Sequence, residues 1–141
     1  MNKPKIVIGI DPGTITGIAV WDVEKKKLLQ VTSLPIHRAF EDVMFWWVES
    51  MGDILVRWED ARKRKWYGKN STAKVQGAGS IKRDCRIWEA FFEDYKIENE
   101  PLDPKDLMTK VDDATFRKIT KWTKRTNEHA RDAALMVFKY K

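Results

Sequence analysis

The stretch that decides the fold is IVIGIDPGTITGIAV, residues 6–20. A run of apolar, strand-forming residues stops at Asp11, turns through Pro12 and Gly13, and continues into a second apolar run. The first strand, over residues 5–11, is apolar at nearly every position, which is typical of a central strand covered on both faces. The pattern therefore predicts a buried strand that ends on a carboxylate.

The residues that follow extend this strand into a mixed sheet. Two further strands are expected over residues 17–23 and 27–34, joined by the short polar turn DVEKKK in an antiparallel meander. Residues 37–50 carry apolar side chains at helical spacing, which predicts an amphipathic helix that Gly52 ends. A fourth strand over 53–60 then returns by a right-handed crossover, parallel to the first strand and in contact with it. We therefore expect Asp11 and Glu59 to lie together at neighbouring strand ends.

The second half of the chain predicts helices around a short extended segment. Ser71 or Thr72 caps a long helix that reaches residue 95, and two prolines favour an edge strand or loop within 96–107. Two helices, over 113–122 and 127–140, close an α/β domain. The long helix has an apolar stripe of Ile81, Cys85, Trp88 and Phe92, and we assign Trp46, Trp47, Trp58 and Trp88 to the core or an interface.

Composition narrows the class of protein. The chain has 141 residues, 43% hydrophobic and 34% charged, the size and make-up of one soluble domain, and it contains no apolar run of membrane-spanning length. The start lacks signal-peptide features and Cys85 is the single cysteine, so we expect a cytoplasmic protein without an intramolecular disulfide or multi-cysteine zinc site. A net charge of +6 and a pI near 9.4 favour an anionic partner such as nucleic acid.

Acidic residues interrupt apolar surroundings at three places. Asp11 and Glu59 end their strands, and His129 and Asp132 share one face of the last predicted helix. Taken singly, these residues fit a turn, a surface ion pair or a solvated helix face. Gathered at one sheet end, they suit Mg²⁺ or Mn²⁺, and two such ions can activate water for phosphodiester hydrolysis.

Three motifs carry a resemblance to a known family. IGIDPGTITGIAV, VRWEDAR and HARDAALMV, in this order and spacing, resemble the RuvC family of Holliday junction resolvases, within the ribonuclease H-like superfamily. The resemblance spans nearly the whole chain. It implies a ribonuclease H-like fold with a five-stranded mixed sheet flanked by α-helices, and a single RuvC-like nuclease domain over residues 1–141. The small size is compatible with a viral member of that family.

The resemblance also implies a site and an activity. Asp11, Glu59 and Asp132 match family carboxylates, and His129 stands where many members have Asp and some have His. These four residues are expected to be catalytic and to hold two Mg²⁺ ions, with Mn²⁺ as a substitute, in an endonuclease that cuts four-way or branched DNA. The family implies a homodimer through the long helix. There Gly77 and Gly79 suit close approach of another backbone or a kink in the helix.

Two basic sets are candidates for contacts with nucleic acid. The segment RKRKWYGK follows Glu59 and interleaves cations with aromatics, which suits phosphates and unpaired bases, although a charge run also fits a solvated loop. Its candidates are Arg62, Lys63, Arg64, Lys65, Trp66, Tyr67 and Lys69. Some relatives have an aromatic residue close behind the catalytic Glu, where this chain has Arg62. The second set is Lys118, Lys121, Lys124, Arg125 and Arg131.

Three alternative functions stay open at this level. A RuvC-like nuclease that trims structured RNA would share both fold and metal site. The DPGTITG turn also resembles the phosphate-binding first motif of actin-like and sugar kinase ATPases, which need two such domains to enclose ATP. A catalytically silent DNA-binding module is the third, and the presence of Asp11, Glu59 and Asp132 argues against it.

Overall fold

The computed structural model describes residues 3–64 and 72–141, with side chains in the second stretch described from residue 79. Five strands form one mixed sheet in the order β3-β2-β1-β4-β5. They are β1 (Ile6–Asp11), β2 (Ile15–Asp22), β3 (Lys27–Pro35), β4 (Ile54–Glu59) and β5 (Asn99–Leu102). β2 is antiparallel to both its neighbours, whereas β1, β4 and β5 are parallel, so the predicted meander and crossover are confirmed.

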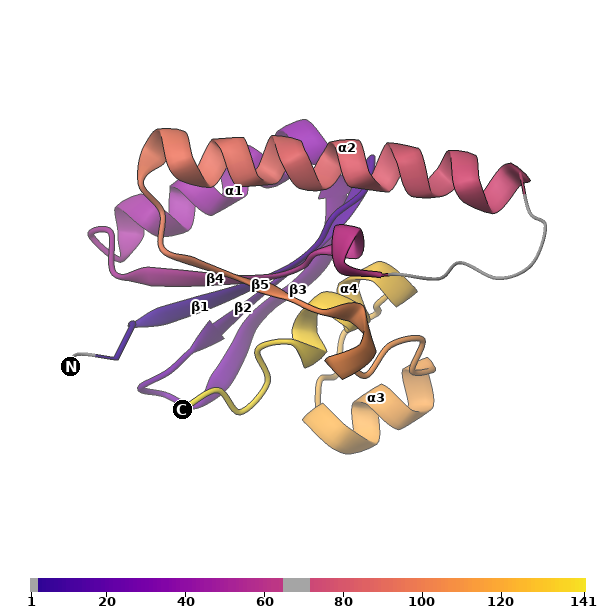
Figure 1. Ribbon diagram of the computed structural model, residues 1–141. Helices are drawn as coiled ribbons and strands as arrows, with labels where there is room; N and C mark the ends of the chain where they lie inside the picture. Colours follow the sequence, from indigo (N-terminus) through magenta and orange to yellow (C-terminus); the bar gives the residue numbers. More distant parts are fainter. Residues whose placement is uncertain (1–2, 65–71) are drawn as a thin grey trace.

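Helices cover both faces of the sheet (Figure 1). Helices α1 (Ile36–Glu49) and α2 (Thr72–Tyr95) lie on one face, and α3 (Asp113–Thr120) and α4 (Glu128–Leu135) lie on the other. Short 3-10 turns follow β4 at Ala61–Lys63 and β5 at Pro104–Asp106. This architecture is the predicted α/β fold with a five-stranded mixed sheet flanked by helices.

Alternation along the strands divides the core into two layers. Ile6, Ile8 and Ile10 of β1 pack with Trp58, Trp88 and Phe92 beneath α1 and α2. Val7 of the same strand packs with Trp21, Phe116 and Val137 on the α3 and α4 side. Because successive side chains of a strand point to opposite faces, Asp11 has the orientation of Val7 and faces α4. The core thereby determines which face of the sheet carries the acid.

The last helix differs from its expected length. A continuous helix over 127–140 was expected, but α4 ends at Leu135 and the chain turns, with Lys139 in the left-handed region at φ 62°. The turn brings the Tyr140 carbonyl oxygen to the Trp21 indole N–H, at 3.1 Å. The apolar residues up to Leu135 belong to the helix, whereas those that follow are apolar because the turn packs against β2.

Two other expectations need correction at the level of helix faces. Val48 is one of the apolar residues whose spacing predicted the helix over 37–50, and Ile81 was expected on the apolar stripe of α2, but they are 63% and 40% exposed. Ala39 and Val43 are buried on α1, and Cys85, Trp88 and Phe92 are buried on α2 as expected. Within the described residues, no helix has the length and apolar character needed to cross a membrane.

Candidate active site

Asp11 and Glu59 meet at the carboxyl ends of two neighbouring parallel strands. Ile10 of β1 pairs with Trp58 of β4, so the next position of each strand is an acid. Trp58 belongs to the core under α1 and α2, which turns Glu59 to the opposite face, the one that Asp11 also faces. Parallel pairing and the two-residue alternation together place both carboxylates on the α4 side.

Helix α4 supplies the other two candidate residues and lies very close to the sheet. His129 is in its first turn and Asp132 follows one turn later, so both share the face toward β1. A Cβ atom added at Gly17 would overlap the carbonyl oxygen of His129, and one added at Gly9 would overlap that of Ala133. The two glycines therefore permit a helix-to-sheet approach that no other residue type allows.

The side chains of His129 and Asp11 are in direct contact. His129 Nδ1 lies 3.0 Å from Asp11 Oδ2, and the Asp11 side chain is only 12% exposed against 55% for His129. The hydrogen bond to Asp11 raises the pKa of His129 above its ordinary value, because the carboxylate stabilises the imidazolium form. The contact joins α4 to the end of β1 across the candidate site.

Burial and neighbouring negative charges also raise the pKa values of Glu59 and Asp132. Burial is the main cause that raises the pKa of Glu59 to about 7, and the negative charge of Asp11, a hydrogen bond with Asp11 and the charge of Asp132 add to it. Burial also raises the pKa of Asp132, partly opposed by the Lys110 backbone N–H, which donates to Asp132 Oδ1 at 3.0 Å. Glu59 and Asp132 therefore share an environment, beside Asp11, that disfavours their ionised forms.

The donors suit a hard divalent cation, although their present contacts are with one another. Among the described residues, no group of three or more His, Cys, Asp or Glu side chains is arranged to hold a metal ion. Asp11 is engaged by His129, and one oxygen of Asp132 by Lys110. Carboxylates are nevertheless ligand types for Mg²⁺ and Mn²⁺, and the imidazole suits the softer Mn²⁺ better. A cation would relieve the repulsion that, together with burial, raises the pKa of Glu59.

Arg62, expected at a nucleic-acid contact, forms a clamp behind Glu59 that we call the Arg62 clamp. Its guanidinium donates to both oxygens of Asp60 at 2.8 Å and to both oxygens of Glu89 on α2, at 3.1 and 2.7 Å. Burial opposes ionisation of Asp60, but the hydrogen bonds from Arg62 hold its pKa below the ordinary value. The clamp fastens the turn after β4 to helix α2.

The other basic candidates have different surroundings. Lys118 lies on α3, Lys121 ends that helix, and Lys124 and Arg125 lie in the loop before α4, all exposed. Arg131 is used within the fold, because its Nε donates to the Val111 carbonyl oxygen at 2.7 Å. Lys63 and Arg64 are exposed after β4. Lys65, Trp66, Tyr67 and Lys69 lie outside the described residues.

Two features of the site were missed at the level of sequence. The first is the pair of glycines beneath α4, for which the available signal was a glycine inside an apolar strand, a pattern that often marks close backbone approach. The second is the loop before α3, where Lys110 orients Asp132 through its backbone N–H. A backbone donor leaves no signature in residue types, so this contact had no signal.

Comparison with known proteins places the fold. An α/β domain with a β3-β2-β1-β4-β5 sheet and acids at the ends of β1 and β4 has the ribonuclease H-like architecture. A solved structure similar to it is T. thermophilus RuvC in complex with Holliday junction substrate, with a TM-score of 0.56 and 14% sequence identity over 96% of this chain and 92% of that one. No protein-family model and no curated protein matches the sequence.

Proposed function

We propose that this protein is a divalent-metal-dependent endonuclease that cuts four-way or otherwise branched DNA. The observation that carries the proposal is the meeting of Asp11, Glu59, His129 and Asp132 at one end of a RuvC-like sheet. The similar solved structure is bound to a Holliday junction, which supports branched DNA as the substrate class. The whole chain, residues 1–141, then acts as one nuclease domain in the cytoplasm.

Asp11, Glu59 and Asp132 are the residues that would hold Mg²⁺ or Mn²⁺, with His129 as a fourth ligand. When bound, two such ions supply an activated water and stabilise the leaving oxygen of a phosphodiester. The side chains must first exchange their contacts with one another for contacts with the ions, and the crowding of negative charge around Glu59 favours that exchange.

The chain's own residues have separable tasks in this proposal. Asp11, anchored at the end of β1, orients the His129 ring through Nδ1, which leaves Nε2 as the nitrogen that can meet the substrate phosphate or an ion. Glu59, with a pKa of about 7 before metal binds, can hold or release a proton near neutral pH. Asp132 is held in place by the Lys110 backbone.

Binding of the DNA is assigned to exposed cations of α3 and of the loop before α4. Lys118, Lys121 and Arg125 lie on α3 and on the loop that leads into α4, the helix that carries His129 and Asp132. Such cations neutralise phosphates and release counterions. We also propose a homodimer, so that two sites cut symmetric strands. A Cβ added at Gly79 meets no atom of the described residues within 4 Å, so this part of the chain leaves space beside α2.

A strand-cleavage assay tests the proposal. End-labelled four-way junction, linear duplex of the same sequence and hairpin RNA are incubated with the protein in Mg²⁺, in Mn²⁺ and in EDTA. We expect cleavage of the junction in either metal, none in EDTA, and loss of at least roughly a hundredfold in rate for Asp11→Asn. Binding of the junction in EDTA should persist for that variant, because the amide keeps the shape of the carboxylate and reduces repulsion of phosphate.

The matched control is Asp103→Asn, which changes an aspartate in the turn after β5 whose side chain caps that turn. It should cut at the wild-type rate. Preference for the hairpin RNA over the junction would replace branched DNA by structured RNA as the substrate. Absence of cleavage of all three substrates, with junction binding intact, would reject a nuclease and favour a silent binding module.

A further inference from the structure

A pocket of about 550 Å³ lies at the end of the sheet opposite the acids. Trp21, which lines it, pairs with Val7 of β1, and Asp11 stands four residues further along that strand. At roughly 3.3 Å per residue, the two positions are about 13 Å apart along the strand. The pocket is therefore separate from the candidate active site, and its use does not depend on whether the protein cuts DNA.

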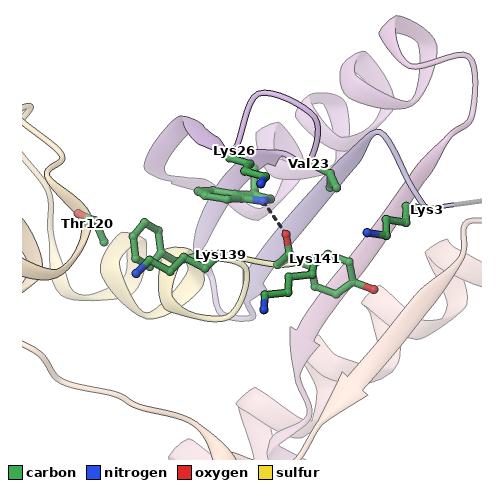
Figure 2. A pocket seen from close by; sticks show the side chains of 9 residues that line it. Lys3, Val23, Lys26, Thr120, Lys139 and Lys141 are labelled. Atoms are coloured by element: carbon green, nitrogen blue, oxygen red, sulfur yellow. Dashed lines mark hydrogen bonds between the residues drawn. The ribbon is translucent and has the colours of Figure 1, made fainter.

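Aromatic rings form the wall of this pocket. Trp21, Phe138 and Tyr140 line it, and the Trp21 indole N–H donates to the Tyr140 carbonyl oxygen at 3.1 Å (Figure 2). The Trp21 and Phe138 rings pack edge to face, with their centroids 5.5 Å apart. A hydrogen bond and a ring contact thus fix a largely apolar wall, in which Trp21 is only 3% exposed and the half-buried Phe138 and Tyr140 rings are the ones that a flat ligand can contact.

Lysines from three segments surround the opening. Lys3 precedes β1, Lys26 lies in the turn between β2 and β3, and Lys139 and Lys141 follow α4 (Figure 2). None of the nine lining residues is acidic. Within the described residues, none of these four lysines forms an ion pair with a carboxylate. The Lys139 ammonium instead lies over the Phe138 ring, 5.5 Å from its centroid.

We propose that this pocket binds a nucleoside phosphate, with its base against the aromatic wall and its phosphate among the lysines. Lysine ammonium groups are point charges that suit phosphate oxygens, and a lining that contains four lysines and no acidic residue suits a dianion. Aromatic side chains add stacking that is tolerant of base identity. The volume lies in the range of small-molecule sites. The ligand is either a free nucleotide or a nucleotide of a single strand.

The test uses the Trp21 indole N–H as a local reporter. In ¹H–¹⁵N spectra recorded in EDTA, its signal is assigned with Trp21→Phe and followed while adenosine 5′-monophosphate, adenosine, inorganic phosphate or a short single-stranded oligoadenylate is added. We expect a saturable shift with the monophosphate at lower concentration than with adenosine or phosphate alone. Tighter binding of the oligoadenylate would identify a strand as the source of the nucleotide, and tighter binding of the monophosphate a free ligand.

Variants separate the pocket from general attraction to a basic protein. Lys26→Gln and Lys139→Gln should each weaken monophosphate binding roughly two- to fivefold, the range expected for an exposed ion pair. Lys105→Gln, an exposed lysine outside the pocket, should leave it unchanged. No shift of the Trp21 signal with the monophosphate, or equal losses in all three variants, would overturn the proposal, as would adenosine binding as tightly as the monophosphate.

Discussion

His129 is the residue at which the site departs from a set of carboxylates alone. Its Nδ1 is engaged by Asp11 at 3.0 Å, and more than half of its side chain is exposed toward solvent. Imidazole is a better partner for Mn²⁺ than for the harder Mg²⁺. The identity of this one side chain therefore has a consequence for the metal that supports the reaction.

For His129→Asp, we expect a change in metal preference rather than loss of activity. The wild-type protein should cut a four-way junction in Mn²⁺ at least as fast as in Mg²⁺, and the variant should narrow that difference severalfold, because an oxygen ligand replaces nitrogen. Initial cleavage rates in each metal measure the ratio. If His129→Ala cuts like wild type in both metals, His129 is a surface neighbour and the site consists of three carboxylates.

Glu59 makes the stability of the metal-free protein depend on pH. Its pKa is raised to about 7, whereas an unfolded glutamate titrates near its ordinary value, about 4.3. The contribution of Glu59 to stability is therefore fully present below about pH 4.3, and it is lost progressively as the pH rises toward 7 because the folded state resists ionisation of this carboxyl group. In EDTA, this contribution to the free energy of unfolding should fall over the range by at most about 4 kcal/mol.

Urea denaturation in EDTA across this pH range measures the decrease. Glu59→Gln should flatten it, and Glu93→Gln, which changes an exposed glutamate of α2, should not. Mg²⁺ or Mn²⁺ at pH 8 should restore stability to the wild type more than to Glu59→Gln, since binding to the folded state stabilises it by mass action. A wild-type profile that is flat without metal would contradict the crowding of charge at this site.

At the scale of elements, the Arg62 clamp joins the turn after β4 to α2. Asp60 is nearly buried, with a side chain 5% exposed, and Arg62 is its cationic partner. Removing the guanidinium leaves a buried carboxylate unpaired, which is costly. We therefore expect Arg62→Gln to lower the free energy of unfolding by about 2 kcal/mol, measured by urea denaturation at neutral pH.

The matched control for this prediction is Arg38→Gln. Arg38 also pairs with a glutamate, but both side chains are more than 60% exposed, so we expect a loss below about 0.5 kcal/mol. The Arg62 clamp lowers the pKa of Asp60 in the folded protein. The stabilisation that the clamp provides is therefore fully present above the pKa of an unfolded aspartate, and it is lost as the pH falls through the lower pKa of the folded state. The difference between wild type and Arg62→Gln should accordingly shrink below about pH 4. Equal losses in the two arginine variants would contradict the clamp.

Comparison of the predicted and observed elements shows which features can be predicted from residue patterns. Apolar alternation and helical spacing were sufficient for the strands, the crossover and the convergence of Asp11 with Glu59, because these depend on local periodicity and on one handedness rule. The role of Arg62 was not accessible in this way. Its partner Glu89 is 27 residues away on another helix, and a run of cations gives no indication of which member is paired. The length of α4 was missed because a turn packed against Trp21 is as apolar as a helix.

The whole molecule carries a net charge of +6, and the distribution of that charge bears on the proposed binding of DNA. If Lys118, Lys121 and Arg125 contact phosphates, changing all three to Gln should weaken junction binding and reduce the slope of log K against log salt by up to about 3, roughly one per contact. Binding measured in EDTA over a range of salt concentrations gives both quantities. The loss should be similar for different sequences, because phosphate contacts carry no sequence information.

An equal change of net charge elsewhere provides the control. Lys25, Lys27 and Lys96 are exposed at the end of the sheet opposite Asp11, and their triple change to Gln should alter the slope by less than one contact. Equal slopes for the two triple variants would show that Lys118, Lys121 and Arg125 do not contact phosphates and only contribute to the general charge of the surface. For the whole molecule, the net charge can be counted from the sequence. The face of the molecule on which each cation lies is known only from the fold.

The close contact between α4 and the strands has a consequence for how substitutions in this protein would be interpreted. Because the backbone of α4 fills the space above Gly9 and Gly17, even a methyl group there must push away the helix that carries His129 and Asp132. In a saturation scan scored by cleavage, both positions should tolerate no other amino acid, alanine included. Such a scan would find Gly9 and Gly17, which have no side-chain functional group, as sensitive to substitution as Asp11. Thermal denaturation would separate the two kinds of residue. Gly17→Ala should lower the melting temperature because the added methyl group displaces α4, whereas Asp11→Asn should lose cleavage without a comparable loss of stability.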